Sequence, residues 1–239
     1  MTRTRLIAGF LTVAAAIVAA GVVFVARQGG SSHKATAFEV AQKAVAHQLQ
    51  ITSAVGPNTT LHQVVISHLS SEKASLNRTP QDTRSEGWWF FGPDGRLAAY
   101  FARTTDMSGQ TVVDTQVRDA TGALVETTNG RTQTTIKDYT LDASQVAASF
   151  ASGVVASRDE LTGPDASAPV DATTGDYIIS TAHERQYIDP VSYRLVKVEE
   201  LDDSGAVTES KEFPALDVSD GNTVPVTPLA TETAVAGSG

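Results

Sequence analysis

The sequence predicts an α+β domain, in which helices accompany an antiparallel sheet, behind one N-terminal transmembrane helix. Three observations lead to this prediction. Turns rich in glycine, aspartate and asparagine recur at roughly ten-residue intervals along two stretches of the chain, as in antiparallel meanders. Two amphipathic segments carry capping signals, one before the strands and one between them. A long uncharged apolar stretch precedes all of these elements.

The apolar stretch Leu6–Ala26 is 21 residues long and carries no charge. As a helix it would be about 31 Å long, enough to cross a bilayer core. Arg3 and Arg5 precede it, so we expect residues 1–5 to be a cytoplasmic tip and the bulk of the chain to be extracytoplasmic. No clear small-x-small cleavage site follows, which favours an uncleaved single-pass signal anchor over a cleaved signal peptide, the alternative.

The composition of the 239-residue chain excludes several classes of function. It has no cysteine, which excludes disulfides, thiolate metal sites, cysteine nucleophiles and an acylated lipobox. Three of the 18 basic residues and none of the 27 acidic ones lie up to Arg27, which leaves 15 basic against 27 acidic residues, a net charge of −12. We therefore expect no nucleic-acid partner, and contact with lipid only through the anchor or a pocket.

Two helices are expected in the extracytoplasmic part. A linker at residues 27–34 leads to a helix at 36–54, where Thr36 and Glu39 form a capping box. Its apolar residues recur at helical spacing: Phe38, Ala41, Val45, Leu49 and Thr52. A second helix is expected at 142–152, where Asp142 and Gln145 form another capping box.

The remaining pattern is that of strands and turns. Residues 60–70 fit either a helical face or a strand, and the β-branched run Val64-Val65-Ile66 favours the strand. Further strands are expected at 87–91, 96–103, 111–118, 123–127, 132–137, 177–182, 185–188, 193–201 and 206–213. Residues 157–175 are expected to form an exposed, mobile loop. We expect the folded domain to cover 35–215 and a disordered tail to cover 216–239.

The late strands and their turns resemble a known superfamily. The segment Tyr187–Glu200, with Asp189-Pro190 at its turn, is followed by the Asp203–Gly205 turn, and Glu86–Phe91 is followed by the Asp94-Gly95 turn. These features resemble the LolA-like superfamily, which includes lipoprotein carriers, RseB/MucB-type sigma-factor regulators and LppX/LprG lipid-binding lipoproteins. The resemblance implies a curved antiparallel half-barrel covered by helices on its concave face, with acyl chains or a hydrophobic peptide segment held between sheet and helices.

A binding groove of this kind would be lined by apolar and aromatic residues of the sheet and of both helices. Whether the space is hollow or filled stays open at this stage. The lining residues that we expect are Trp88, Trp89, Phe91, Tyr100, Phe38, Val45, Leu49, Val146 and Phe150.

The sequence contains none of the common catalytic or nucleotide-binding motifs. Ser70 and Lys73 match Ser-x-x-Lys, but the partner motifs of that nucleophile are missing, so we expect a solvated turn. Glu199 and Glu200 are neighbours on a strand and should point to opposite faces. We therefore expect no enzyme, no metal and no cofactor.

Two functional hypotheses remain. The first is a membrane-anchored extracytoplasmic binding protein that holds lipid, or an apolar segment, in the half-barrel groove. The alternative is a regulatory protein of the same fold that binds the extracytoplasmic segment of a membrane-protein partner. A tethered chain cannot ferry cargo between membranes, which argues against a shuttle.

Overall fold

The structure is a computed structural model that describes residues 34–109, 111–118, 121–128, 131–136, 140–151, 153–155 and 157–225. The expected anchor Leu6–Ala26 and tip 1–5 lie outside these residues. Within the described part, no helix has the length and apolar character needed to span a bilayer.

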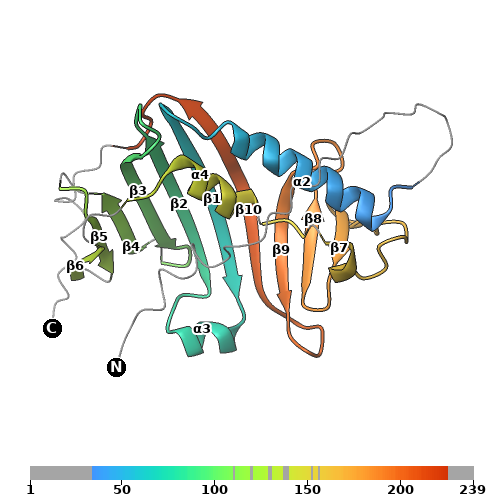
Figure 1. Cartoon of the computed structure of the whole chain (residues 1–239). Coiled ribbons are helices and arrows are strands. Elements are labelled where there is room, and N and C mark those ends of the chain that lie inside the picture. The colour runs from blue at the N-terminus through green and yellow to red at the C-terminus, as the bar shows by residue number, and fades with distance from the viewer. Residues whose placement is uncertain are drawn as a thin grey trace.

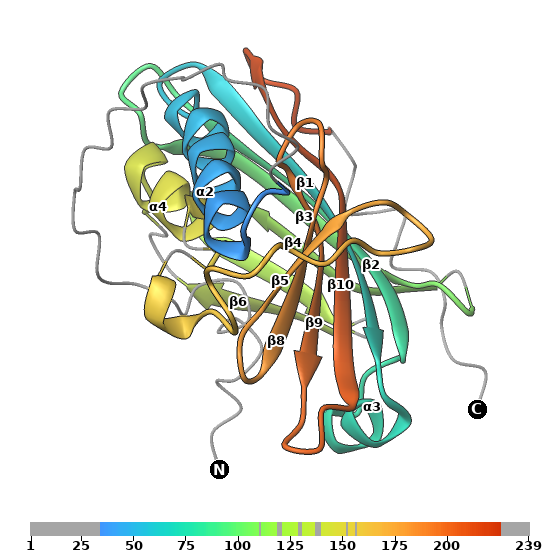
Figure 2. The same ribbon diagram turned by 90° about the vertical axis from the view of Figure 1, so that its right-hand side faces the viewer.

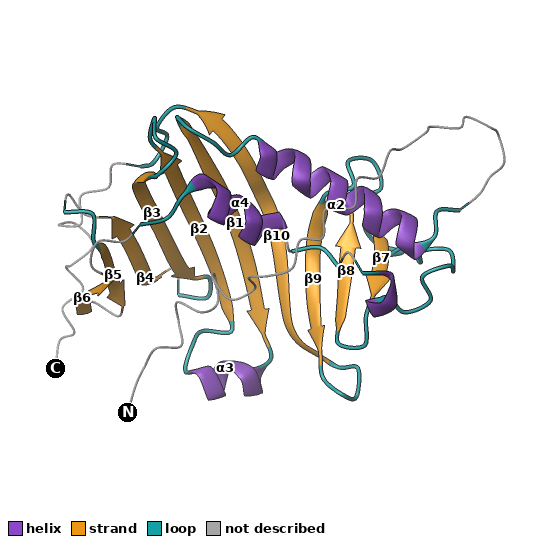
Figure 3. Cartoon of the chain, in the orientation of Figure 1, coloured by secondary structure: helices purple, strands orange, loops and turns teal. Residues whose placement is uncertain are grey.

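Ten strands form one antiparallel sheet in the order β6-β5-β4-β3-β2-β1-β10-β9-β8-β7 (Figures 1 and 3). The strands are β1 Thr59–Leu69, β2 Asp82–Phe91, β3 Leu97–Asp106, β4 Thr111–Arg118, β5 Leu124–Thr128, β6 Arg131–Ile136, β7 Tyr177–Ser180, β8 Glu184–Ile188, β9 Leu195–Leu201 and β10 Val207–Asp220. The strand prediction at 60–70 is confirmed, because β1 covers it.

The central pairing of the sheet joins the first strand of the described chain to the last. β1 pairs with β10 from Thr59↔Asp220 to Leu69↔Glu209. On its other edge β1 pairs with β2, from Thr60↔Phe90 to His68↔Asp82. Two meanders, β1 to β6 and β7 to β10, thereby become one continuous sheet.

Two helices lie on the same face of this sheet, here called the helix face; the opposite face is called the outer face (Figure 2). Helix α2, Ala37–Ser53, starts with the expected capping box of Thr36 and Glu39. Helix α4, Ala143–Ala151, also starts as expected, since Asp142 and Gln145 each bond the other's backbone N–H. The predicted α+β architecture of an antiparallel sheet covered by helices is therefore confirmed.

Each helix covers its own apolar cluster. Cluster 1 lies under α2 and is formed with strands β7 to β9 and the segment after α4; its buried members are Ala37, Val40, Ala41, Ala44, Val154, Leu161, Ala168, Ile179, Ile188 and Leu195. Cluster 2 lies under α4, mainly over β1 to β3; its buried members are Val55, Leu61, Trp89, Phe91, Leu97, Tyr100, Leu124, Ala143 and Val146. Both clusters are packed cores, which fix the helices to the sheet.

The segment 157–175, expected as an exposed mobile loop, is tied to the start of α2. The backbone N–H groups of Ala37 and Phe38 donate to the carbonyls of Ala166 and Pro164, both at 3.0 Å. Leu161 is buried in cluster 1. The loop also covers the outer edge of β7, where Ile178 N–H donates to the Pro169 carbonyl at 2.8 Å. These bonds protect an otherwise exposed sheet edge.

A short helix, α3 Ser71–Asn77, lies where the sequence was interpreted as a turn. Ser70 is its N-cap, and Arg78 ends it in the left-handed conformation at φ 55°. Lys73 fixes it to the sheet, because its Nζ lies 2.6 Å from carboxylate oxygens of both Glu200 and Glu209. A helix of seven residues repeats its helical spacing too few times for the sequence pattern to distinguish it from a turn.

The boundary predicted at residue 215 is wrong. β10 continues to Asp220, and Leu216 and Val218 pack against cluster 2. Pro214 suggested a strand end, since proline has no N–H for the ladder. In the structure it lies at a shift in register, where Val64 pairs with Ala215 and Ile66 pairs with Glu212.

This boundary has a direct test. Ending the chain after residue 215 should lower the free energy of unfolding by about 3 kcal/mol or more, because it removes ladder hydrogen bonds and two half-buried apolar side chains. A chain ending after residue 225 keeps all described contacts of β10 and serves as the control. Equal urea midpoints for the two truncations would contradict the assigned strand.

Candidate binding site on the helix face of the sheet

The side chains of the helix face follow from the register of the sheet. Leu61, Trp89 and Tyr100 are cross-strand partners on β1, β2 and β3, and all three belong to cluster 2. The next row on the same face contains Gln63, Gly87, Ala102, Gln116 and Glu126. The helix face thus changes from apolar under α4 to polar beyond it.

Gly87 determines the position of the largest aromatic ring in this region. A Cβ atom at residue 87 would lie only 2.6 Å from Cη2 of Trp89, so the indole ring lies directly over the glycine. The ring also contacts Tyr100, at 5.4 Å between centroids, and Phe150 of α4, at 5.7 Å with edge-to-face geometry. Trp89 therefore connects α4 to the polar part of the sheet.

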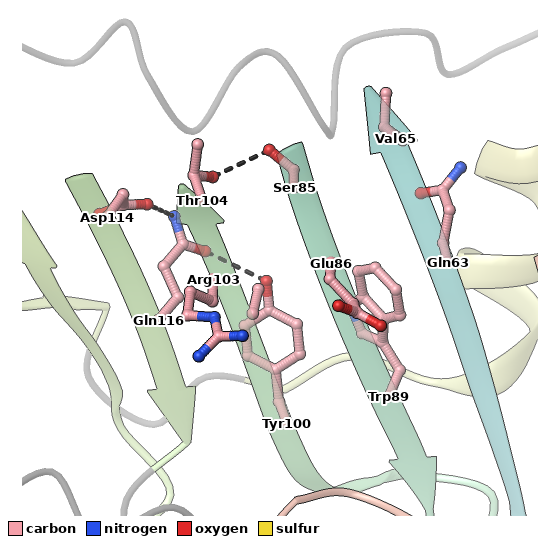
Figure 4. A pocket seen from close by; sticks show the side chains of 12 residues that line it. Gln63, Val65, Ser85, Glu86, Trp89, Tyr100, Arg103, Thr104, Asp114 and Gln116 are labelled. Atoms are coloured by element: carbon pink, nitrogen blue, oxygen red, sulfur yellow. Dashed lines mark hydrogen bonds between the residues drawn. The ribbon is translucent and has the colours of Figure 1, made fainter. Parts of the chain in front are cut away.

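A hollow of about 20 Å³ opens beside this ring (Figure 4). Its lining comes from the four neighbouring strands β1 to β4: Gln63, Val65, Ser85, Glu86, Gly87, Trp89, Tyr100, Ala102, Arg103, Thr104, Asp114 and Gln116. This volume suits one water molecule or a group of similar size. Pockets for drug-sized or acyl ligands have volumes of about 300–1,000 Å³, so the hollow is far too small for a lipid chain in this conformation.

Polar side chains at the β4 end of the hollow form a connected network. The Tyr100 hydroxyl donates to the Gln116 side-chain carbonyl at 3.1 Å. The Gln116 amide donates to Asp114 at 3.3 Å and to Glu126 at 3.4 Å. Thr128 donates to the second Asp114 oxygen at 2.8 Å. Burial raises the pKa of Asp114, and the nearby Glu126 charge adds to this rise, while the bonds from Thr128 and Gln116 oppose it.

The structure brings together five of the sequence-predicted lining residues. Trp89, Phe91, Tyr100 and Val146 are buried in cluster 2, and Phe150 packs against it. Trp89 and Tyr100 also line the hollow, whereas Phe91 is fully buried.

Two further lining residues, Phe38 and Val45, lie elsewhere. Both pack against cluster 1 under α2. The side chain of Arg158 lies over the Phe38 ring, 5.1 Å from its centroid. They therefore contribute to the core beneath α2 and not to the hollow.

Trp88 and Leu49 are not part of the helix-face packing. Trp88 lies on the outer face, because neighbouring side chains of a strand alternate, and its ring stacks on His62 at 4.8 Å. Leu49 is 49% exposed. The apolar face of α2 is centred instead on Ala37, Val40 and Ala44, so the expected face was displaced around the helix.

The polar lining residues were missed by the sequence analysis. Gln63, Asp114 and Gln116 lie within strands, on the face of the sheet that carries the helices. A register that pairs Gln63 with Gly87 and Leu216 was needed to identify this face. The alternation of side chains along a strand was the signal that could have identified Gln63. It lies two residues from the buried Leu61 and so on the same face of β1.

The expected turn chemistry at Ser70 and Lys73 does not form a nucleophile. Ser70 Oγ accepts from the Lys73 backbone N–H at 3.2 Å, and the Lys73 ammonium is held by Glu200 and Glu209. Burial lowers the pKa of Lys73, but the bonds and charges of the two glutamates raise it more, so the amine stays protonated. Among the described residues no group of three or more His, Cys, Asp and Glu side chains is arranged to hold a metal ion.

No protein family and no curated protein matches the sequence. Solved structures do match. The MucA/MucB complex of Pseudomonas aeruginosa matches with 15% identity and a TM-score of 0.34, over 76% of this chain and 59% of the matched chain. A domain from Vibrio parahaemolyticus assigned to outer membrane lipoprotein sorting matches with 8% identity and a TM-score of 0.30, over 78% of this chain and 95% of that one.

The chain covers between 57% and 63% of the length of the MucB chains that it matches.

The role of Gly87 can be tested by adding the single methyl group that the site lacks. Gly87→Ala should destabilise the fold by about 1–3 kcal/mol and change the fluorescence of Trp89, because the ring has to leave its place. Gly92→Ala is the control, since its Cβ would lie 3.4 Å from the nearest atom. If urea unfolding gives the two variants the same stability, the assigned ring position is wrong.

Proposed function

We propose that this chain is a non-catalytic binding protein, held at the outer side of a cell membrane by Leu6–Ala26, whose helix face receives an extended segment of a protein partner. The polar lining of the hollow supports this proposal most strongly. Gln63, Asp114 and Gln116 offer amide and carboxylate groups, which suit a peptide backbone and polar side chains and do not suit an acyl chain.

The packing of the helices supports the same choice. Clusters 1 and 2 fill the space beneath α2 and α4, and the hollow between the described elements is about 20 Å³. A lipid chain would require α4 to separate from the sheet and would expose Val146 and Trp89. A peptide segment laid on the polar part of the sheet leaves this core intact. A protein partner is also what the resemblance to the sigma-factor regulators implies.

Native mass spectrometry with lipid extraction, on the full chain released from detergent, distinguishes the two kinds of ligand. We expect the protein at its own mass, without a stoichiometric apolar adduct, because the apolar space is already filled. A bound fatty acid or phospholipid in a one-to-one ratio would contradict the proposal and favour the lipid-holding alternative.

A further inference from the structure

His62, on the outer face of the sheet, is held between two carboxylates from neighbouring strands. Its Nε2 lies 3.0 Å from Oε1 of Glu86 on β2, and its Nδ1 lies 3.2 Å from Oδ2 of Asp217 on β10. The His62 side chain is 20% exposed, and its ring stacks on Trp88. One imidazole therefore connects the three adjacent strands β2, β1 and β10.

Both contacts of His62 can exist together only when its ring is protonated. A neutral imidazole has one N–H donor and one nitrogen lone pair, whereas the imidazolium ion has two donors, and a carboxylate oxygen only accepts. A neutral ring would therefore bond one of the two carboxylates and direct its lone pair at the other. The geometry at His62 is that of the charged ring, and the loss of one proton removes one of the two contacts.

The charged groups around His62 come from each of the adjoining strands. On β2, Glu86 also accepts a bond from Arg84. Burial raises the pKa of Glu86, but the bonds and charges of Arg84 and His62 lower it more, so this carboxylate is ionised at neutral pH. On β3, Arg103 is the cross-strand partner of Glu86. On β10, Asp217 is the cross-strand partner of His62.

The exposure of the two carboxylates indicates which contact the neutral ring gives up. The Glu86 side chain is 16% exposed, so a lost hydrogen bond there is poorly replaced by water. The Asp217 side chain is 59% exposed, so water can solvate it at little cost. The neutral ring of His62 therefore keeps Glu86 and releases Asp217.

The contact with Asp217 acts on a part of β10 that packs against the core. Leu216 and Val218 flank Asp217 in the sequence, and both pack against cluster 2 under α4. The register pairs Asp217 with His62 and Val218 with Leu61. A bond that fastens Asp217 to β1 on the outer face therefore also holds its two neighbours in place on the helix face.

We propose that His62 is a proton-operated latch for the end of β10: the protonated ring holds Glu86 and Asp217 together across β1, and the neutral ring releases Asp217. This latch goes beyond the proposed function, since it needs no partner. Imidazole side chains change charge between pH 5 and 8, and carboxylates are ionised above about pH 5. The latch is therefore closed in mildly acidic solution and open in mildly alkaline solution.

Urea unfolding of the full chain in detergent, at pH 5.5 and at pH 8, tests the latch. Asp217→Asn removes the carboxylate that the neutral ring releases and keeps a side chain of nearly the same size. We expect it to lower the urea midpoint by roughly 0.3 M at pH 5.5 and to leave the midpoint unchanged at pH 8. Asp203→Asn is the matched control, because it removes a charge from an exposed turn and should have the same effect at both pH values.

Histidine variants separate the latch from a general effect of charge. In a His62→Gln background, Asp217→Asn should no longer lower the urea midpoint at pH 5.5, because the donor that it lost is already absent. His183→Gln is the control, since His183 is exposed between β7 and β8. In that background Asp217→Asn should keep its full effect at pH 5.5.

Three results would overturn the latch. They are an equal loss of stability from Asp217→Asn at both pH values, no loss at pH 5.5, and a loss at pH 5.5 that persists in the His62→Gln chain. The first two are measured with a change to an exposed side chain alone, so the test does not depend on the His62→Gln chain being folded.

Discussion

The pairing of β1 with β10 is the constraint on which the other features of this structure depend. It joins residues that are about 150 positions apart, and it converts two local meanders into one sheet. The same pairing determines which side chains of β1 face the helices. A slip of one residue would turn Leu61 and Gln63 to the outer face and bring His62 under α4, so the register specifies the core and the hollow together.

The helix face combines two kinds of surface that follow from this register. Where α2 and α4 cover the sheet, small and aliphatic side chains fill the space, and the two clusters leave no room for a large ligand among the described residues. Beyond α4 the same face carries amides, hydroxyls and carboxylates. Trp89 lies at the border, with Phe150 on one side and the hollow on the other. Binding of a partner beside this ring therefore needs no opening of the core.

Local sequence signals predicted the local structure well. The capping boxes at Thr36 and Asp142 marked the helix starts correctly, because such bonds involve residues only three apart. Turn residues marked the ends of the strands for a similar reason, because a turn also involves residues that are neighbours in the sequence. The joining of the meanders was not predicted by such signals, since it involves residues distant in the sequence. The length of β10 was missed because a register shift accommodates Pro214.

The candidate site was predicted only in its aromatic part. Trp89 and Tyr100 were expected to line a groove, and they line the hollow. The polar half, with Gln63 and Asp114, was missed because a polar residue within a strand ordinarily faces solvent, and only the pairing of strands shows otherwise. The error at Leu49 is the opposite one. Its helical spacing suggested a buried side chain, but the sheet packs against the neighbouring face of α2, so Leu49 is exposed.

The central claim is that the helix face, and not the outer face, contacts a protein. Site-specific photo-crosslinking in cells tests this directly, with a photoreactive amino acid in place of Thr104, which lines the hollow, or of its neighbour Thr105, which points the other way. We expect the Thr104 position to yield one discrete crosslinked protein that the Thr105 position does not capture. Lipid adducts at Thr104 without a protein product, or the same capture from both positions, would contradict the claim.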